Sequence, residues 1–259
     1  MRLILYQVDA FTDKLFSGNP AAVCPLGKWL DDSVLQNIAA ENNLSETAFF
    51  VKEGDHYRIR WMTPTNEVDL CGHATLASAF VIFNELDKSL DKIVFHSRSG
   101  ELIVTRDGSL ISLNFPANKP APQTSPGNLL DVFPIAPQEV LFNKTFLLVF
   151  RSESEIRRMK PDIKKLLEVP TFGVIITARG DTVDFVSRFF IPQAGIDEDP
   201  VTGYAHTLLI PYWSEKLRKK KLHALQVSKR GGELFCEDLK ERVKISGKAV
   251  LYFKGSIVF

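Results

Sequence analysis

The sequence predicts an α+β protein of two pseudo-symmetric lobes, each a mostly antiparallel, barrel-like sheet wrapped around one central buried helix. Two observations lead to this prediction. The chain contains a long, weak internal duplication, and each copy includes one helical segment that is apolar on all sides. A length of 259 residues allows one large domain or two smaller ones, and the duplication decides in favour of two.

The duplication consists of the same features in the same order in both halves. An aromatic strand ends in proline at residues 60–64 and again at 188–192. A short acidic loop follows each strand and leads to a glycine, Gly72 or Gly203, with small and hydroxyl-bearing residues after it. A Gly-Glu-Leu triplet then occurs at nearly the same distance in each half. The two halves are therefore interpreted as homologous.

These features also suggest where the lobes begin and end. We place the N-terminal lobe at residues 1–116 and the C-terminal lobe at 117–248. The proline-rich stretch 116–126 is the natural linker between them. The final strand, within 249–259, can return to either half, and we group it with the N-terminal lobe.

The two central helices are predicted over residues 73–84 and 204–213, which carry no charge. A helix that is apolar all round must be surrounded by protein or lipid, and these two are too short to cross a bilayer. Pro211 is expected to bend or end the second helix. Other elements are expected as outer helices at 33–42 (capped by Asp32) and 162–168, and as strands at 47–51, 101–105, 110–115 (with an Asp-Gly turn before it), 183–190, 234–237 and 243–246.

The composition excludes several classes of protein. The chain carries 32 Lys and Arg against 31 Asp and Glu, so its net charge of +1 creates no field for nucleic acid or an anionic membrane. The apolar runs are too short to span a bilayer and no secretory signal is recognised, so a cytoplasmic protein is expected. Cys24, Cys71 and Cys236 are far apart and odd in number, which fits neither a disulfide framework nor a zinc motif. We expect no cofactor and no metal.

The start of each central helix is the predicted binding region. A buried helix start has backbone N–H groups without intrahelical partners, and it carries the positive end of the helix dipole. Two such starts facing each other across the junction of the lobes would form a dry pocket for a small carboxylate. Gly72 and Gly203 would allow close backbone approach there. The alternative is that both glycines only permit tight packing.

Four side chains are candidates for chemistry, one at the start of a strand and three at or just before the helix starts. Glu46 opens an apolar strand, where a raised pKa would suit a general acid or base, although an exposed strand-end carboxylate fits the pattern equally. His73, in the first helical turn, is expected to be a neutral hydrogen-bonding imidazole or a satisfied core histidine. Cys71 is either a base or nucleophile at a helix start or a small buried residue. Asp199 by itself is interpretable as a helix-capping acid.

Several long motifs together resemble the PhzF-like (phenazine biosynthesis-like) family, which is related in fold to diaminopimelate epimerase. The matching stretches lie at residues 8–11, 16–23, 45–49, 63–64, 67–77 and 198–203. The resemblance implies two lobes of the predicted kind, with the active site in the cleft between them. In the isomerase that names the family, a glutamate at the position of Glu46 moves a proton between carbons of a dihydro-hydroxyanthranilate without a cofactor. Residues matching His73 and Asp199 hold or polarise the substrate there.

The resemblance implies further residues at the substrate. Gly72 and Gly203 match the backbone around it, Asn19 lies in a motif close to the cleft, and Ser45 precedes the glutamate within its motif. The residue after the second glycine is commonly a small polar one in the family, often serine. Here it is Tyr204, which implies a different pocket and a different substrate.

The sequence therefore predicts a cofactor-independent isomerase that moves a proton between carbons of a small carboxylate through Glu46. One alternative is a racemase or epimerase that uses Cys71. The epimerase relatives use two cysteines, whereas the second half here offers Asp199 and Thr202, which disfavours a two-thiol mechanism. Another alternative is a small-molecule-binding protein that has lost the reaction, supported mainly by Tyr204. Homodimers are common in the family, and no nucleic acid or membrane partner is expected.

Overall fold

The structure, a computed structural model, describes residues 2–259 and divides them into two compact units. The first unit comprises the residues up to Phe115 together with Ile245–Phe259, and the second comprises Pro116–Lys244. Residues 245–248, which the sequence analysis placed in the second lobe, thus belong to the first unit. The proline-rich stretch expected as a linker lies in the second unit, where it contributes a short strand, Ala121–Pro122.

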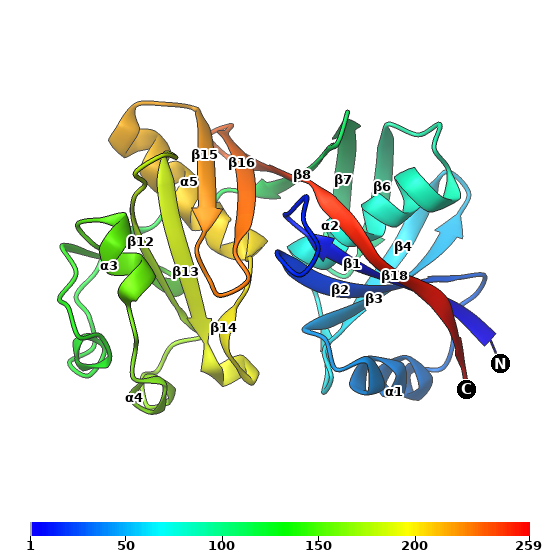
Figure 1. Cartoon of the computed structure of the whole chain (residues 1–259), viewed down its shortest axis with the longest axis horizontal. Helices are drawn as coiled ribbons and strands as arrows, with labels where there is room; N and C mark the ends of the chain where they lie inside the picture. The colour runs from blue at the N-terminus through cyan, green and yellow to red at the C-terminus, as the bar shows by residue number, and fades with distance from the viewer. Residues whose placement is uncertain (1) are drawn as a thin grey trace. The chain divides into compact units, whose positions relative to one another are not determined.

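The first unit is built from strands around helix α2 (Figure 1). Its elements are β1 (Arg2–Ala10), β2 (Asn19–Leu26), α1 (Asp32–Asn42), β3 (Glu46–Glu53), β4 (His56–Met62), β5 (Glu67–Val68), α2 (Gly72–Val81), a π-helical turn (Ile82–Leu86), β6 (Lys92–Ser97), β7 (Gly100–Asp107), β8 (Leu110–Pro116) and β18 (Ala249–Val258).

The second unit repeats this order of elements. They are β9 (Ala121–Pro122), a 3-10 turn (Leu130–Val132), β10 (Glu139–Asn143), β11 (Thr145–Val149), α3 (Glu153–Arg158), α4 (Ile163–Leu167), β12 (Val174–Arg179), β13 (Phe185–Ile191), a 3-10 turn (Pro192–Ala194), β14 (Ile196–Asp199), α5 (Gly203–Leu217), β15 (Lys221–Gln226), β16 (Gly232–Asp238) and β17 (Arg242–Gly247), whose last residues belong to the first unit.

Strand pairing follows one pattern in both units. In the first unit β2 pairs with β3 and β4 with β6 in parallel, whereas β3–β4, β4–β5 and β6–β7 are antiparallel. In the second, β11–β12 and β13–β15 are parallel, and β12–β13, β13–β14 and β15–β16 are antiparallel. The turn predicted between β7 and β8 is confirmed, since Asp107 pairs with Leu110 and Gly108 has a φ of +58°. The predicted α+β class with mostly antiparallel pairing is confirmed.

Helix α2 is buried on all its faces and lies against β1, β2, β3 and β18. Its two hydroxyl side chains are satisfied within the helix, because those of Thr75 and Ser78 donate to the carbonyls of Cys71 and Ala74. Helix α5 is buried from Gly203 to Ser214 apart from the half-buried Tyr204. Both helices therefore form the centre of their unit, as their uncharged sequences predicted.

Helix α5 continues through Pro211 to Leu217, which corrects the expectation that it ends near residue 213. Proline lacks the N–H that would bond the carbonyl of Thr207 one turn earlier. That carbonyl instead accepts the N–H of Asn118 at 3.0 Å, and the Thr207 hydroxyl oxygen accepts from the Asn118 amide at 2.9 Å. The donor that the proline removes is thus replaced from another segment of the unit.

The cap expected for the first outer helix is also corrected. Helix α1 begins at Asp32 with Asp31 as its N-cap residue, so the predicted start was one residue late. The Asp32 carboxylate accepts a hydrogen bond from Arg60 Nη1 at 2.8 Å rather than from the helix backbone. Helix α4 begins directly after Asp162, where the sequence predicted a helix start. The Asp162 side chain caps the helix, because it accepts the N–H of Lys165 at 3.2 Å.

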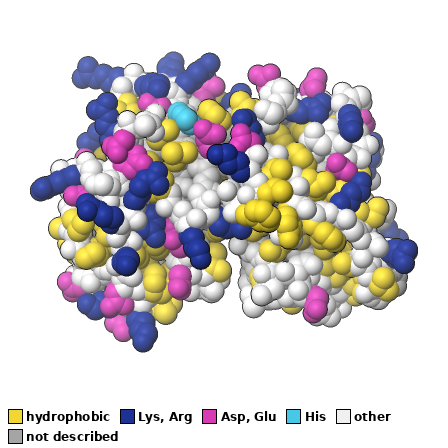
Figure 2. All heavy atoms as spheres, in the orientation of Figure 1, with side chains coloured by type: hydrophobic (Ala, Val, Ile, Leu, Met, Phe, Trp, Pro, Cys, Tyr) yellow, Lys and Arg dark blue, Asp and Glu magenta, His cyan; other side chains and the backbone are white. Residues whose placement is uncertain are grey.

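The outer surface of the first unit carries apolar side chains along β18. Figure 2 shows hydrophobic atoms gathered on the visible face of this unit, and Tyr252 and Phe253 of β18 are half-exposed. Phe16 packs edge-on against Tyr252, with ring centroids 5.8 Å apart. Among residues 2–259, no helix combines the length and the hydropathy that a membrane crossing needs.

Candidate active site

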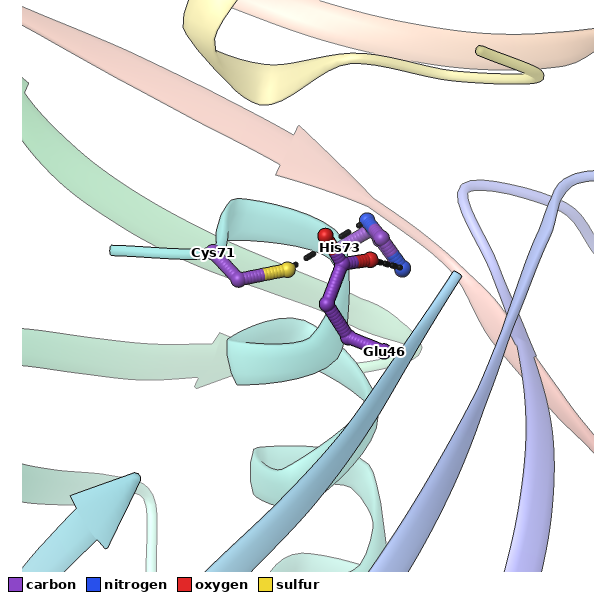
Figure 3. A group of neighbouring side chains, drawn as sticks. All are labelled: Glu46, Cys71 and His73. Carbon is purple, nitrogen blue, oxygen red and sulfur yellow. Dashed lines mark hydrogen bonds and ion pairs between the residues drawn. The ribbon is translucent and has the colours of Figure 1, made fainter. Parts of the chain in front are cut away.

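Glu46, Cys71 and His73 come together in the first unit (Figure 3). Glu46 is the first residue of β3, Cys71 is the N-cap residue of α2, and His73 lies in the first turn of that helix. His73 Nε2 is 3.2 Å from Glu46 Oε2, and His73 Nδ1 is 3.5 Å from Cys71 Sγ. Cys71 and His73 are buried, whereas the Glu46 side chain keeps 19% of its surface exposed. The carboxylate is therefore the group of this cluster that is most open to a substrate.

Asn19, at the start of β2, determines which ring nitrogen of His73 carries the proton. It is fully buried, and its Nδ2 lies 3.2 Å from His73 Nδ1. An amide nitrogen donates, so we assign Nδ1 as the acceptor and place the imidazole proton on Nε2, which faces Glu46. Burial lowers the pKa of His73 to about 3, so the ring is neutral at pH 7. The neutral imidazole expected from the sequence thus has its Nε2 on the side of Glu46, 3.2 Å from Oε2.

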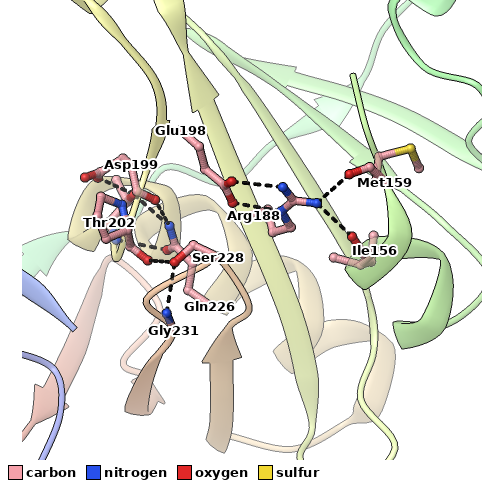
Figure 4. A network of polar contacts seen from close by, with 10 residues as sticks. Ile156, Met159, Arg188, Glu198, Asp199, Thr202, Gln226, Ser228 and Gly231 are labelled. Atoms are coloured by element: carbon pink, nitrogen blue, oxygen red, sulfur yellow. Dashed lines mark hydrogen bonds and ion pairs between the residues drawn. The ribbon is translucent and has the colours of Figure 1, made fainter. Parts of the chain in front are cut away.

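Asp199 and Thr202 come together in the second unit with Gln226 (Figure 4). The Thr202 hydroxyl donates to Asp199 Oδ2. Gln226 Nε2 donates to the Asp199 carbonyl at 2.8 Å and to Thr202 Oγ1 at 3.1 Å, while Gln226 Oε1 accepts the Thr202 N–H at 2.9 Å. All three side chains are nearly inaccessible to solvent. This network holds the last residue of β14 against the N-cap residue of α5.

The other predicted residues take the following places. Gly72 and Gly203 are the first residues of α2 and α5, as expected. Ser45 directly precedes β3 and is half-buried. Tyr204 hydrogen-bonds through its hydroxyl to Thr145 Oγ1 at 3.1 Å, so its phenol is engaged with β11 of its own unit.

Two kinds of polar contact, an arginine–glutamate ion pair and a serine hydrogen bond, recur at matching places in the two units. Arg60 makes a two-pronged ion pair with Glu67, with N–O distances of 2.8 and 2.7 Å, and Arg188 makes one with Glu198 at 2.7 and 2.9 Å. Each joins the strand before the acidic loop to the loop itself.

The loop that precedes each central helix is also tied by a serine. Ser99 donates to the carbonyl of Asp69 at 2.9 Å, and Ser228 donates to that of Pro200 at 2.8 Å. These paired contacts define a residue-by-residue alignment of the two halves, in which Arg60 corresponds to Arg188.

This alignment shows that the second unit has no counterpart of the Glu46 side chain. Thr47 pairs with Met62 as Val174 pairs with Phe190, so Glu46 corresponds to Gly173. A Cβ at Gly173 would lie 2.5 Å from Ile191 Cγ2 and 2.7 Å from the Phe190 carbonyl oxygen. The second unit therefore has no room for a side chain where the first carries Glu46. By the same alignment, the position of Asp199 corresponds to Val68.

Two residues of the second unit were missed by the sequence analysis. Gln226 is the link between Asp199 and Thr202, and His206 is a fully buried histidine whose Nδ1 bonds the Thr202 carbonyl at 2.8 Å. Burial lowers the pKa of His206 to about 4. A signal for Gln226 was present, since it is an amide at the end of an otherwise alternating strand at 221–226. The contacts that both residues make depend on tertiary structure.

Comparisons with known proteins agree with this architecture. The family model described as phenazine biosynthesis-like protein, PhzC-PhzF, matches residues 8–255. An uncharacterized isomerase of Pseudomonas aeruginosa is 52% identical over 99% of both chains. The crystal structure of a PhzF-family phenazine biosynthesis protein from Enterococcus faecalis is 46% identical, covers 100% of both chains and superposes with a TM-score of 0.98.

A more distant likeness concerns the fold alone. The structure of a hydroxyproline epimerase from Agrobacterium vitis is 9% identical, with a TM-score of 0.61 over 99% of this chain and 92% of that one. The matches over the full length decide the assignment, because both the family model and the relatives cover nearly every residue. The chain belongs to the PhzC-PhzF, phenazine biosynthesis-like family, and its class of enzyme is the isomerases.

Proposed function

We propose that this protein is a cofactor-independent isomerase in which Glu46 moves a proton between two carbons of a small carboxylate. The observation that carries the proposal is the Glu46 carboxylate beside the buried His73, at 3.2 Å, at the start of a central helix. Glu46 is partly open to solvent, whereas its partner is not. A carboxylate in this setting can exchange protons with a ligand while the neutral imidazole lies beside it.

The reaction balances with this carboxylate alone. Glu46 takes a proton from one carbon, and the electron pair of the broken C–H bond moves through the adjacent unsaturated system. The same carboxyl group then returns the proton to a second carbon, which forms a new C–H bond there. Nothing is oxidised or reduced, so the chain's own carboxyl group is sufficient. We assign to His73 the role of orienting Glu46 and the substrate.

We assign the second cluster a part in holding the substrate, which rests on the family resemblance of Asp199. Its support in the structure is the fixed position of that carboxylate, to which the Thr202 hydroxyl donates. The substrate class, a small carboxylic acid, is proposed because the buried starts of α2 and α5 attract anions.

A single base is favoured over a symmetric pair by the filled space at Gly173. A mechanism with a second acid or base at the corresponding place would need a side chain there. Cys71 corresponds to Thr202, which is not an acid-base group of comparable strength. The first unit therefore supplies the carboxylate that we propose as the base.

The test uses small carboxylic acids that carry a C–H bond next to a double bond or a carbonyl. Each is incubated with the protein in deuterated water, and NMR follows double-bond migration and deuterium uptake. We expect isomerisation of at least one compound and a loss of about 10²–10⁴-fold in Glu46→Gln. Glu53→Gln, at the other end of β3, is the matched control and should keep the wild-type rate.

Three outcomes would overturn the proposal. Wild-type turnover by a folded Glu46→Gln variant would remove Glu46 from the reaction. Exchange that survives Glu46→Gln but disappears in Cys71→Ser would establish instead a racemase or epimerase, whose structural support is Cys71 Sγ at 3.5 Å from His73 Nδ1. Saturable binding without any reaction would point to a protein that only binds small molecules.

A further inference from the structure

The Glu46, Cys71 and His73 cluster has a composition that acid-base chemistry does not account for. A carboxylate oxygen, a thiol sulfur and an imidazole nitrogen, one atom from each residue, all lie within 4.8 Å of one another. Proton transfer through Glu46 needs only the carboxylate and its imidazole partner. The thiol at the same point adds a soft ligand to a nitrogen and an oxygen ligand, a set that Zn²⁺ binds readily.

We propose that Glu46, Cys71 and His73 together bind a thiophilic divalent cation, with Zn²⁺ as the ion that this set of ligands fits. The three residues supply three ligands and leave a fourth position, the number that open tetrahedral zinc sites have. Ligand exchange at that position is possible because Glu46 is the partly exposed member.

Metal binding requires the His73 ring to turn and to give up the hydrogen bond that its Nδ1 accepts from Asn19. Zinc bonds to oxygen, nitrogen and sulfur of about 2.0–2.3 Å place tetrahedral ligands roughly 3.3–3.7 Å apart. The contacts of 3.2 Å from Glu46 and 3.5 Å from Cys71 are of about this length, although they end on different nitrogens of the His73 ring. Glu46 faces Nε2 and Cys71 faces Nδ1, so the ring must turn to present one nitrogen to the ion. Binding releases the thiol proton of Cys71 to solvent, because the thiolate is the ligand.

The Cys71 thiol differs from the thiols of Cys24 and Cys236 in its position in the fold. Cys24 is fully buried in β2 and Cys236 is buried in β16, and neither belongs to a group of neighbouring ligand side chains among residues 2–259. Burial raises the pKa of the Cys24 thiol to about 12 and that of Cys236 still further. These cysteines are therefore matched controls for thiol-dependent binding.

The consequence for activity rests on the proposed function. An ion that occupies the Glu46 carboxylate prevents it from taking a proton, so Zn²⁺ should inhibit the isomerase reversibly. Removal of the ion by a chelator should restore the rate.

The experiment measures metal binding directly on the full chain, without substrate. Zn²⁺ is titrated in competition with a chromophoric chelator, and Co²⁺ is used as a spectroscopic probe for a sulfur-to-metal charge-transfer band. We expect one ion per chain and a thiolate band with Co²⁺. Cys71→Ser should abolish the band, and Glu46→Gln should weaken Zn²⁺ binding by at least ~10–100-fold, the loss typical of even an outer-shell partner. Cys24→Ala and Cys236→Ala should keep both properties.

Several results would overturn the proposal. These are the absence of stoichiometric Zn²⁺ binding, a thiolate band that persists in folded Cys71→Ser, or binding that depends on Cys24 or Cys236. Circular dichroism checks the fold of each variant, and Cys71→Ala serves if the serine variant is unstable. Because no turnover is measured, failure here leaves the proposed isomerase intact, and failure of the isomerase assay leaves the zinc site intact.

Discussion

The two units share their framework but not their reactive groups. Both have the same order of strands, a central helix that begins at a glycine, an arginine–glutamate pair and a serine tie on the loop before the helix. The first unit adds Glu46 and His73, and at the corresponding places the second has Gly173 and Tyr204. The contacts that shape the loop are thus retained in both halves, whereas Glu46 and His73 are specific to one.

The difference is physical as well as chemical. Space at Gly173 is filled by Phe189, Phe190 and Ile191 of the neighbouring strand β13. Tyr204 is engaged with Thr145 of its own unit. Three pairs of substitutions and one single variant, His206→Gln, measure how far the two halves have diverged.

The largest effect is expected from the arginine–glutamate pairs. Arg188→Ala should lower the free energy of unfolding by about 3 kcal/mol, since Arg188 is the one cation at ion-pair distance from Glu198 among residues 2–259 and also bonds two carbonyls. Arg60→Ala should cost about 1 kcal/mol, because Glu67 keeps Arg98 at 2.7 Å. Urea unfolding of both variants provides the comparison. Equal losses would show that Arg98 does not replace Arg60.

The second prediction concerns pH and His206. Its pKa is lowered by burial to about 4 from 6.5, so the unfolded chain binds more protons between these values. As far as His206 is concerned, the free energy of unfolding is highest above pH 6.5. It falls by up to about 3 kcal/mol as the pH is lowered toward 4. The hydrogen bond to the Thr202 carbonyl opposes the shift only in part.

Urea unfolding at pH 7 and pH 4.5 checks this for wild type and His206→Gln. The histidine contribution is the part of the pH dependence that disappears in the variant, whatever the carboxylates add. In the first unit the matching residue is Thr75, whose hydroxyl does not titrate. An unchanged pH dependence in the variant would mean that His206 does not titrate as proposed.

The third comparison tests the space at Gly173. Gly173→Ala should lower the free energy of unfolding by about 1–3 kcal/mol, because the new methyl group overlaps Ile191 and the Phe190 carbonyl. Glu46→Ala, at the matching place, should change it by less than about 1 kcal/mol, since a Cβ is already accommodated there. Thermal unfolding distinguishes the two. A neutral Gly173→Ala variant would show that β12 and β13 can move apart.

The smallest effects are expected from the serine ties. Ser228→Ala removes the donor to Pro200 and the acceptor of the Gly231 N–H, so a loss of about 1 kcal/mol is expected. Ser99→Ala should cost less, because its contact with Asp69 is exposed to water. Amide hydrogen exchange in the first turns of α5 and α2 reports each loop. Faster exchange in α2 than in α5 would reverse the expected order.

The sequence was sufficient for features that depend on local pattern. Uncharged segments after Gly72 and Gly203 predicted the central helices, and the repeated order of strand, acidic loop and glycine predicted two similar units. Contacts between distant segments were not predictable. Asn118 supplies the donor that lets α5 pass through Pro211, and Gln226 joins β15 to the loop before α5. Neither partner can be identified from the residues beside it in the sequence.

The pairing of β18 with β1 has a consequence for synthesis of the chain. Ala249 pairs with Ala10 and Val258 with Arg2, so the first strand made is completed by the last. The second unit, Pro116–Lys244, is continuous and is synthesised before β18. We expect the second unit to fold without β18, whereas the first unit cannot complete its sheet until β18 is made, against the usual order in which N-terminal domains lead. A chain that stops before Ala249 would leave one edge of β1 unpaired, which makes prematurely ended products prone to aggregate.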